Sequence, residues 1–403
     1  MTNLFKLIAF SCCLALPLIG SGCSHSQIAT EPYPIWGESI FLPVENGESR
    51  RHMQIRELSQ SADDIQACIL IVHGMNEHTG RYAEIARHFA QSHLIAGIDM
   101  TAHGLSNPVY LDAHESLKAG ADEFDVGSAF LEQSQLRNLD AMRADLHLAI
   151  RHLRQRCDKS AGDDKPLVIL SHSLGSLVSA SYLLEAKLPD TVDGIIFTGP
   201  AFAVTEVPGW RGWFQNPLIG FTYHTQEHFL HPHDEAFPLM LFNQFTALLT
   251  VPLQNGIIEF LSLPGMRNIF SPSNPDWVAA YLSDWEVERL RHKHDRYIMH
   301  RSILRYVQGV QKEIIRFRRN MADFDTPYLL IYSEFDPITA AWGNIDFAAV
   351  TLEKHPLNEV MPLIGKSHHE QLFSEPRLRR EVLDKIDRWL ESLIAEHKQP
   401  NEY

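Results

Sequence analysis

A short turn near the middle of the chain carries the residue best suited to covalent chemistry, Ser173. The unbroken apolar run Leu167–Leu170 precedes the pentapeptide Ser171-His-Ser-Leu-Gly175, and a helical pattern follows over 176–186. A strand, a tight turn and a helix in this order form the setting in which a G-x-S-x-G turn lifts one hydroxyl clear of the backbone. Ser171 replaces the first glycine, a small-for-small exchange, and the last glycine is kept. We therefore predict that Ser173 is a nucleophile.

A serine nucleophile needs a base that takes its proton and an acid that orients the base. Asp336 follows the apolar run Leu329–Tyr332, and His369 follows the run Val360–Leu363. Singly, an aspartate beside a proline is usually a turn former and a histidine is usually a surface residue. Together they follow Ser173 in the order serine, acid, histidine that nucleophile-elbow folds use. At the carboxyl ends of neighbouring parallel strands these side chains would meet, so the sequence predicts a proton-transfer triad.

The turn after the segment Cys68–Val72 is the candidate oxyanion hole. His73-Gly-Met75 begins there, and a His-Gly turn at a strand end can give a backbone N–H to an oxyanion. The second N–H would come from the residue after the nucleophile. This nominates the backbone N–H groups of Met75 and Leu174. We expect the neighbouring Glu77 and His78 to form a hydrogen-bonded structural loop rather than to act directly in catalysis.

Unbroken apolar runs alternate with helical patterns along the chain. The runs are Ile69–Val72, Ile95–Ile98, Leu167–Leu170, Ile195–Phe197, Leu329–Tyr332 and Val360–Leu363. Short runs of this kind suit strands that are buried on both faces of a parallel sheet. Residues 36–60 indicate one or two leading strands with a turn at Asn46-Gly47. We therefore predict an α/β fold with a mostly parallel sheet and helices on both faces.

One interval, residues 203–296, interrupts the alternation and is too long for a connecting loop. It is rich in aromatic residues, namely Trp210, Trp213, Phe214, Phe221, Phe229, Phe242 and Phe245. We predict an inserted helical cap that lies over the sheet beside Ser173 and lines a slot for an acyl chain. His231-Pro-His-Asp234 and His292-Lys-His-Asp295 alternate histidine with carboxylate as zinc ligands can, but each lacks a matched third ligand. We expect solvated loops there and no metal.

The first residues have the pattern of a secretory signal, since Lys6 precedes the apolar run Leu7–Ile19 and small residues lead to Cys23. A cysteine in this place resembles the lipobox of bacterial lipoproteins, although Gly20 stands where a larger aliphatic residue is usual. That resemblance implies a lipid anchor on Cys23. Ser24, rather than aspartate, implies sorting to the outer membrane of a bacterial cell envelope. An ordinary cleaved signal and an uncleaved anchor are the alternatives.

These features divide the chain into segments. They are a lipoprotein signal peptide (1–22), a tether (23–35), the first part of the core (36–202), the cap (203–296), the second part of the core (297–396) and a tail (397–403). After removal of the signal, Cys68 and Cys157 would be the remaining unmodified cysteines. Each is expected just upstream of a strand, at the same edge of the sheet. A disulfide is open if their Cα atoms lie within about 7 Å, but we expect two separately buried thiols.

Composition excludes two broad classes of function. Lys+Arg 35 against Asp+Glu 50 give a net charge of −15 at pH 7, whereas nucleic-acid binding needs a basic surface. No internal stretch reaches the roughly 18 unbroken apolar residues of a membrane-spanning helix, which excludes a polytopic membrane protein. The apolar fraction of 45% is enough for a large core.

The motifs together resemble a known family over about residues 36–395. They are His73-Gly74, His78-Thr-Gly-Arg-Tyr82, Asp99-Met-Thr-Ala-His-Gly-Leu-Ser106, the Ser173 turn, Asp336, and His369-Glu-Gln-Leu-Phe373. This set is similar to the monoacylglycerol lipase and lysophospholipase branch of the α/β-hydrolases, and the last segment resembles bacterial lysophospholipases. The resemblance selects His369 over His368 as the base. The chain departs from the family at Ser171, and at Thr101 and Ala102, where arginine and glycine are usual.

The resemblance implies the α/β-hydrolase fold, an ester hydrolase of single-chain lipids, and no cofactor. We expect hydrolysis of lysophospholipid or monoacylglycerol through an acyl-enzyme on Ser173, at a membrane surface that the protein reaches through its anchor on Cys23. A short-chain carboxylesterase, or a peptidase or acyltransferase on the same fold, is the alternative enzyme. Because Ser171 alters the nucleophile turn, a catalytically silent lipid-binding lipoprotein is the alternative from another class.

Overall fold

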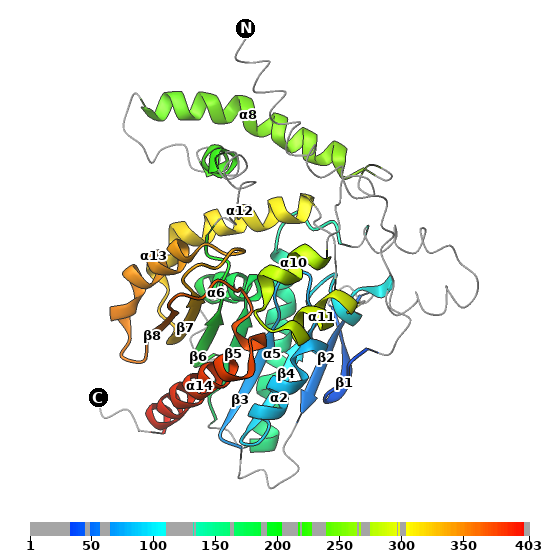
Figure 1. Ribbon diagram of the computed structural model, residues 1–403, viewed down its shortest axis with the longest axis vertical. Coiled ribbons are helices and arrows are strands. Elements are labelled where there is room, and N and C mark those ends of the chain that lie inside the picture. Colours follow the sequence, from blue (N-terminus) through cyan, green and yellow to red (C-terminus); the bar gives the residue numbers. More distant parts are fainter. Residues whose placement is uncertain are drawn as a thin grey trace, which may run out of the picture.

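The computed structural model describes residues 33–44, 49–56, 65–109, 132, 134–161, 165–186, 192–203, 217, 220–227, 239–263, 266, 275–295, 297–298 and 304–398 (Figure 1). The expected signal peptide, the anchor at Cys23, the turn at Asn46-Gly47 and the motif His231–Asp234 lie outside these residues. None of the helices within the described ranges combines the length and apolarity needed to cross a bilayer.

An eight-stranded sheet forms the centre of the molecule, in the order β1-β2-β4-β3-β5-β6-β7-β8. The strands are β1 (Glu38–Pro43), β2 (Arg50–Arg56), β3 (Ala67–Val72), β4 (His93–Ile98), β5 (Leu167–His172), β6 (Gly194–Thr198), β7 (Tyr328–Ser333) and β8 (Glu359–Leu363). The strand β2 is antiparallel to both its neighbours, and the pairs from β4 to β8 are parallel. The predicted mostly parallel sheet is confirmed, and each of the six apolar runs lies within a strand.

Helices cover both faces of the sheet. They are α2 (Ala83–Phe89), α5 (Asp140–Ala161), α6 (Leu174–Ala186), α8 (Leu239–Leu261), α10 (Pro275–Leu282), α11 (Glu286–His294), α12 (Leu304–Asn320), α13 (Ala341–Thr351) and α14 (Pro376–His397). Single 3₁₀ turns are η3 (Thr79–Tyr82), η4 (Gly104–Ser106), η5 (Met321–Asp323), η6 (Leu352–Lys354) and η7 (Gln371–Phe373). This arrangement is the α/β-hydrolase fold.

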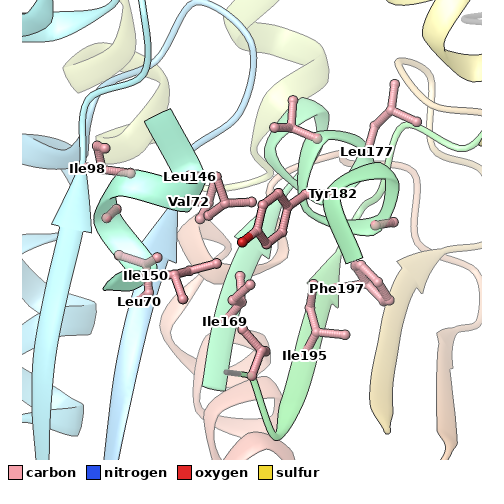
Figure 2. Packing of buried hydrophobic residues seen from close by; sticks show 14 of the residues in the cluster. Leu70, Val72, Ile98, Leu146, Ile150, Ile169, Leu177, Tyr182, Ile195 and Phe197 are labelled. Atoms are coloured by element: carbon pink, nitrogen blue, oxygen red, sulfur yellow. The ribbon is translucent and has the colours of Figure 1, made fainter. Parts of the chain in front are cut away.

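The apolar runs lack alternation because both faces of each central strand are buried. Leu70 and Ile169 point to the face covered by α5, α6, α12 and α13 (Figure 2). Ile71 and Leu170 point to the opposite face, where α2 and α14 pack. Every residue of β3, β4, β5, β6 and β7 is buried, whereas the strand β8 at the sheet edge is half-exposed. A continuous apolar run is therefore what a central strand of this sheet requires.

Between β6 and β7 the described residues form helices and no strand. The helices are α8, α10, α11 and α12, and α8 lies farthest from the sheet (Figure 1). The cap boundaries at 203 and 296 stay a prediction. The expectation of a solvated loop at His292–Asp295 is wrong, because the first three of these residues belong to α11 and His292 is buried.

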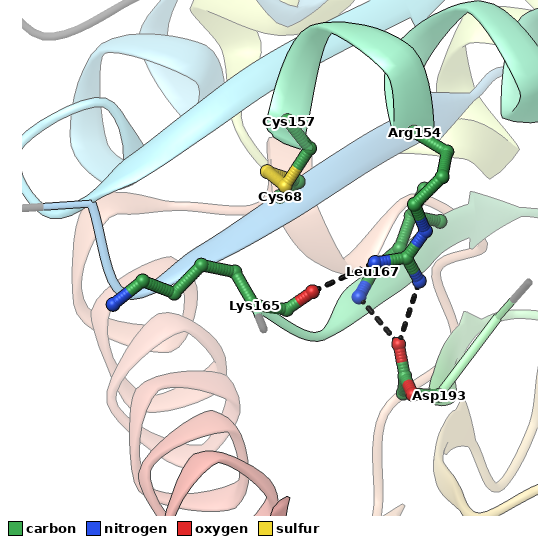
Figure 3. Close-up of a disulfide and its surroundings, with 6 residues drawn as sticks. All are labelled: Cys68, Arg154, Cys157, Lys165, Leu167 and Asp193. Atoms are coloured by element: carbon green, nitrogen blue, oxygen red, sulfur yellow. Dashed lines mark hydrogen bonds and ion pairs between the residues drawn. A yellow bond between two sulfur atoms is a disulfide. The ribbon is translucent and has the colours of Figure 1, made fainter. Parts of the chain in front are cut away.

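The expectation of two separate thiols is also wrong, since Cys68 and Cys157 form a disulfide with Cα atoms 6.2 Å apart (Figure 3). Cys157 does not precede a strand at the sheet edge. It lies in the long helix α5, which packs on the same face of the sheet as the Cys68 side chain. The disulfide therefore joins α5 to β3 and closes a loop of 89 residues.

We expect the double substitution Cys68→Ala and Cys157→Ala to lower the free energy of unfolding by about 2–5 kcal/mol, because it releases this long loop in the unfolded chain. Urea denaturation of the oxidised wild type, the reduced wild type and the variant measures the difference. The reduced wild type should unfold close to the variant. Equal midpoints for the oxidised and reduced wild type would contradict the prediction.

Candidate active site

Ser173 occupies a strained turn between β5 and α6. Its φ of +50° is in the left-handed region, which non-glycine residues rarely adopt. Two backbone hydrogen bonds hold this conformation: Ser173 N–H donates to the Thr198 carbonyl (3.0 Å), and the Ser173 carbonyl accepts from Ala201 N–H (3.1 Å). The turn is therefore fixed to the segment that follows β6, as a nucleophile elbow requires.

The two ends of the elbow show why small residues are needed there. A Cβ on Gly175 would lie 2.4 Å from the His73 carbonyl oxygen, so only glycine lets α6 approach the end of β3. At the other end, the buried Ser171 hydroxyl donates to the Ile196 carbonyl on β6 (3.0 Å). The sheet thus accommodates the exchange at Ser171 with a satisfied hydrogen bond.

Asp336 and His369 form a buried pair at the carboxyl ends of β7 and β8. The imidazole Nδ1 lies 2.7 Å from Asp336 Oδ2. The other carboxylate oxygen, Oδ1, accepts the backbone N–H groups of Ile338 (2.8 Å) and Thr339 (2.9 Å), and the Thr339 hydroxyl donates to Oδ2 (3.1 Å). These donors fix the carboxylate so that His369 Nδ1 carries the proton and Nε2 is left as the base.

In this pair, neighbouring charges and hydrogen bonds shift the pKa values more than burial does. Burial by itself would raise the pKa of Asp336, but His369 and the backbone N–H groups hold it below its ordinary value. Burial would likewise lower the pKa of His369, yet the Asp336 carboxylate raises it above the ordinary 6.5. The Asp336 carboxylate therefore stabilises the imidazolium that forms when His369 accepts a proton.

The imidazole of His369 lies against the residues around Ser173. Its ring centroid is 4.8 Å from that of His172, the residue before Ser173, and a Cβ on Gly199 would lie 3.2 Å from its Nδ1. Within the described part of the chain, the buried His369 Nε2 has no hydrogen-bond partner. Catalytic hydrogen bonds are often long before substrate binds, so a buried base without a partner beside the nucleophile suits a resting enzyme.

The oxyanion-hole candidates lie on both sides of Ser173. Leu174 is the first residue of α6, and the first N–H groups of a helix lack partners within it. On the other side, a Cβ on Gly74 would lie 3.1 Å from Ser173 Cβ, which places the Gly74–Met75 peptide against the nucleophile. Both nominated N–H groups therefore belong to backbone that adjoins Ser173.

His73 controls the direction of that peptide. Its Nε2 accepts the Met100 N–H (3.1 Å), so its Nδ1 carries the proton and donates to the Gly74 carbonyl (2.8 Å). In a trans peptide the carbonyl and the following N–H point in opposite directions, so this bond fixes the direction of the Met75 N–H. Burial lowers the pKa of His73 to about 3, which keeps the ring neutral and the tautomer constant. The His-Gly turn is recognisable in the sequence, but the role of its imidazole follows only from these two hydrogen bonds.

A second group of charged side chains adjoins His369. Arg81 binds Glu370 through both terminal nitrogens (2.8 and 2.9 Å) and reaches Glu77 at 3.2 Å, and all three side chains are buried. Tyr82 also donates to Glu77 (3.0 Å). We name Glu77, Arg81 and Glu370 the buried ion-pair cluster.

The buried ion-pair cluster does not fit a metal site. Ligand atoms of Glu77, His172 and Glu370 lie within 4.8 Å of one another, close enough for one ion. The Arg81 guanidinium, however, already supplies the positive charge between the two carboxylates. Burial raises the pKa of Glu77, whereas Arg81 overcomes burial at Glu370 and lowers the pKa of that carboxyl. Glu77 therefore belongs to a hydrogen-bonded structural loop, as predicted.

His78 also has a structural partner, Asp295, at 2.8 Å from its Nε2. Asp295 directly follows α11, so this pair ties the loop after β3 to the inserted helices. Of the aromatic residues expected to line the acyl slot, Phe242 and Phe245 lie on α8 and are exposed, at 67% and 64%. The other motif residues, Thr101 and Ala102, lie in the turn after β4, where Ala102 adopts the positive φ (+70°) that explains the family's usual glycine.

Comparison with known proteins agrees with this fold. Residues 63–362 match the family model described as serine aminopeptidase, S33. A curated relative, the monoglyceride lipase of Mus musculus, is 27% identical over 137 residues, which are 34% of this chain and 35% of that protein. The matched segment is thus about a third of the relative's length.

Two solved structures share the fold at low identity. A soluble variant of monoglyceride lipase from Saccharomyces cerevisiae, in complex with a substrate analogue, superposes with a TM-score of 0.61 at 12% identity, covering 90% of this chain and 99% of that one. A thermostable carboxyl esterase from Bacillus coagulans, in complex with glycerol, gives a TM-score of 0.53 at 14% identity, covering 89% and 98%.

Proposed function

Because the chain belongs to the serine aminopeptidase S33 family of α/β-hydrolases, we propose that it is a serine ester hydrolase that cleaves single-acyl-chain lipids, either lysophospholipid or monoacylglycerol. The observation that carries the proposal is the buried Asp336–His369 pair, whose imidazole ring lies against that of His172, the residue before the strained Ser173. Substrate class rests on the similarity to monoglyceride lipase and on the family resemblance of the motifs.

The proposed reaction has two halves. Ser173 Oγ attacks the ester carbonyl carbon while His369 Nε2 takes its proton, and the N–H groups of Met75 and Leu174 stabilise the oxyanion. His369 then gives the proton to the leaving alcohol, and the acyl group stays on Ser173. In the second half His369 activates water, which releases the fatty acid and restores the serine. Asp336 holds the imidazole in one tautomer throughout.

Substrate preference separates this proposal from its rivals. The fold occurs in the carboxyl esterase as well as in the lipase, and the family model is described as a peptidase, so neither decides between esters of long and short acyl chains or amides. Rates on p-nitrophenyl esters of rising chain length are the direct test. Faster hydrolysis of decanoate than of acetate supports a lipid hydrolase. The reverse order would instead assign a short-chain carboxylesterase.

Covalent labelling tests whether the protein is an enzyme or a silent lipid-binding protein. We expect a fluorophosphonate to label the wild type and to leave Ser173→Ala unlabelled. Ser176→Ala is the matched control, because Ser176 is a buried serine on the first turn of α6. A wild type that is not labelled would favour the silent lipid-binding lipoprotein.

We also propose that Cys23 is lipidated and anchors the protein in a bacterial cell envelope, on the outer membrane. Its support is the sequence pattern alone. Metabolic labelling with an alkyne fatty acid should mark the wild type and Cys13→Ser but not Cys23→Ser. Equal labelling of Cys13→Ser and Cys23→Ser would remove the anchor without affecting the proposed hydrolysis.

The rate of hydrolysis should depend on pH through His369. Only the neutral imidazole accepts the serine proton, so kcat/KM should fall as the pH is lowered through the pKa of His369. Since Asp336 raises that pKa above 6.5, the fall should begin above the pH at which an ordinary histidine titrates. A pH–rate profile with a short soluble ester measures this midpoint. In Asp336→Asn the pKa of His369, followed by its NMR signal, should be lower than in the wild type, and an unmoved pKa would contradict the assignment.

A further inference from the structure

A second serine, histidine and aspartate are joined by hydrogen bonds at the β1 edge of the sheet. Ser39 on β1 places its Oγ 2.8 Å from Nε2 of His52 on β2, and His52 Nδ1 lies 2.8 Å from Oδ2 of Asp99, directly after β4. This is the connectivity of a hydrolytic triad, with hydroxyl on Nε2 and carboxylate on Nδ1. Such triads are recognised by geometry and roles, not by sequence position. We name these three residues the edge relay.

Strand alternation and register bring the first two of these side chains together. Ile40 and Leu42 pack on the face of the sheet that α5 covers, so Ser39 and Phe41 point to the opposite face. Phe41 is paired with His52 in the antiparallel register, and Ser39 stands two residues away on the same face. Diagonal neighbours of this kind are within reach of a long side chain. The sequence of the two strands therefore specifies the contact.

Asp99 is held as a carboxylate, which fixes the tautomer of His52. Its other donors are the Tyr33 hydroxyl (2.9 Å), the Thr79 N–H (2.7 Å) and the Leu105 N–H (2.9 Å). Burial by itself would raise the pKa of Asp99, but the hydrogen bond from His52 and the nearby histidines lower it to about 2. A carboxylate only accepts, so Nδ1 of His52 donates and Nε2 of the neutral ring is the acceptor. His52 can therefore take the proton of Ser39.

The edge relay is buried at its base and open at its hydroxyl. The side chains of His52 and Asp99 are fully buried, whereas Ser39 is exposed. A reactant can therefore reach the oxygen while the pair behind it stays fixed. The relay is also separate from the Ser173 site: β1 and β5 are four strand spacings apart, about 19 Å. Ser39 thus depends on its own base and not on His369.

We propose that Ser39 is a second nucleophile, which accepts acyl groups from activated esters with His52 as its base and Asp99 as the acid that orients the base. Ser39 Oγ forms a bond to the acyl carbon while His52 Nε2 takes the hydroxyl proton. The bond from carbon to the leaving oxygen or sulfur then breaks, and the leaving atom keeps the electron pair and takes the proton from His52. The products are an acyl ester on Ser39 and a free alcohol or thiol.

The exposure of Ser39 determines the class of substrate. Water, rather than N–H groups held in place, stabilises an oxyanion on an open surface, and loss of one such donor slows acyl transfer by about 10²–10³-fold. A good leaving group compensates, so we expect aryl esters and thioesters to react and alkyl esters of glycerol not to. Ser39 should therefore react at least about 10²-fold more slowly than Ser173. A brief fluorophosphonate reaction that saturates Ser173 leaves Ser39 unlabelled for the same reason.

Acylation of Ser39 is measured in full-length Ser173→Ala, in which the proposed active site does not contribute. The protein is treated with p-nitrophenyl acetate, and the acetyl groups are located by peptide mass spectrometry. Ser392 is the control within the same chain, because it is an exposed serine on α14 whose hydroxyl donates to the Arg388 carbonyl (3.1 Å) and not to a base. We expect acetylation at Ser39 to be at least about 10²-fold faster than at Ser392, the smallest usual effect of a positioned base.

Removal of the base separates a nucleophile from a purely structural hydrogen bond. In the Ser173→Ala background, His52→Gln should lower the acetylation rate of Ser39 to that of Ser392, and circular dichroism verifies the fold. Equal rates at the two serines before this change, or a rate at Ser39 that His52→Gln leaves unchanged, would overturn the proposal. The readout is an acetyl group at residue 39, so a failure of the proposed hydrolysis at Ser173 does not alter it.

A thiol at the same position gives a second measurement that keeps His52 in place. A cysteine beside a histidine has a lower pKa than a free thiol, because the imidazolium stabilises the thiolate. We expect Ser39→Cys to react with iodoacetamide at pH 6 at least about tenfold faster than Ser392→Cys, with the alkylated residue located by peptide mass spectrometry. Equal alkylation rates at the two positions would show that His52 does not activate the group at residue 39, and the proposal would be wrong.

Discussion

Asp336→Asn should lower kcat for ester hydrolysis by about 10⁴-fold, with the fold intact. An asparagine fills the same space and can keep the hydrogen bonds from Ile338 N–H and Thr339 N–H through its carbonyl oxygen. Its amide, however, donates to His369 Nδ1 where the carboxylate accepted. Nδ1 must then become the acceptor, so Nε2 carries the proton and cannot take another from Ser173. The base is lost by a change of tautomer alone.

Single-turnover kinetics with a short p-nitrophenyl ester measure this effect on acylation directly. Asp346→Asn is the matched control, because Asp346 is a half-exposed aspartate on α13 whose partner is Arg318 at 2.8 Å. The control should retain the wild-type kcat. Thermal unfolding should be similar in all three proteins. A loss in Asp336→Asn of less than about tenfold would show that a different carboxylate orients His369, and the triad assignment would then be wrong.

Local sequence could predict those site residues whose position is set by a single strand and the turn that follows it. Ser173, Asp336 and His369 each follow an apolar run, and a parallel sheet brings the ends of its strands to one edge. The strands were predictable for the same reason: burial on both faces leaves an unbroken apolar run. The cluster of Arg81 with Glu370 was not predictable, because these residues are 289 positions apart and neither sequence segment specifies the other.

The errors in the sequence analysis have a common cause. An apolar or cysteine residue does not by itself specify which neighbour it faces. Cys157 was expected before a strand, but the helix α5 continues through it and turns it onto β3. Phe242 and Phe245 were expected to line an acyl slot, but both are exposed on α8, whose buried residues include the smaller Ala247 and Val251. Aromatic content therefore indicated apolar surface in this region without specifying what that surface contacts.

The fold and the active site are joined most closely at the loop after β3. Within a few residues it supplies His73, which directs the Met75 N–H, and Arg81, which binds Glu370, the residue after His369. His369 and Glu370 are in turn held by α10, through the carbonyls of Tyr281 (3.2 Å) and Leu282 (2.7 Å). The inserted helices thus contact the backbone of His369 and Glu370 directly.

Arg81→Met should lower the free energy of unfolding by about 3–5 kcal/mol. The substitution keeps an apolar side chain of similar length but removes the charge between two buried carboxylates. Glu77 and Glu370 would then repel each other where water cannot solvate them. Arg379→Met is the matched control: Arg379 binds Glu84 at 2.7 Å near the surface, and its loss should cost less than about 1 kcal/mol.

The pH dependence of this loss distinguishes charge from packing. In the wild type Arg81 holds the pKa of Glu370 below its ordinary value, so the carboxylate stays charged in the folded state. Without Arg81, burial and the neighbouring carboxylate raise the pKa of both acids, and the folded state binds protons that the unfolded state releases. The stability deficit of Arg81→Met should therefore be largest at alkaline pH and shrink as the pH falls toward 5, and Arg81→Met with Glu370→Gln should recover part of it at high pH. Urea denaturation at several pH values measures both effects. A deficit that is the same at every pH would mean that Arg81 acts through packing on Phe373 and not through its charge.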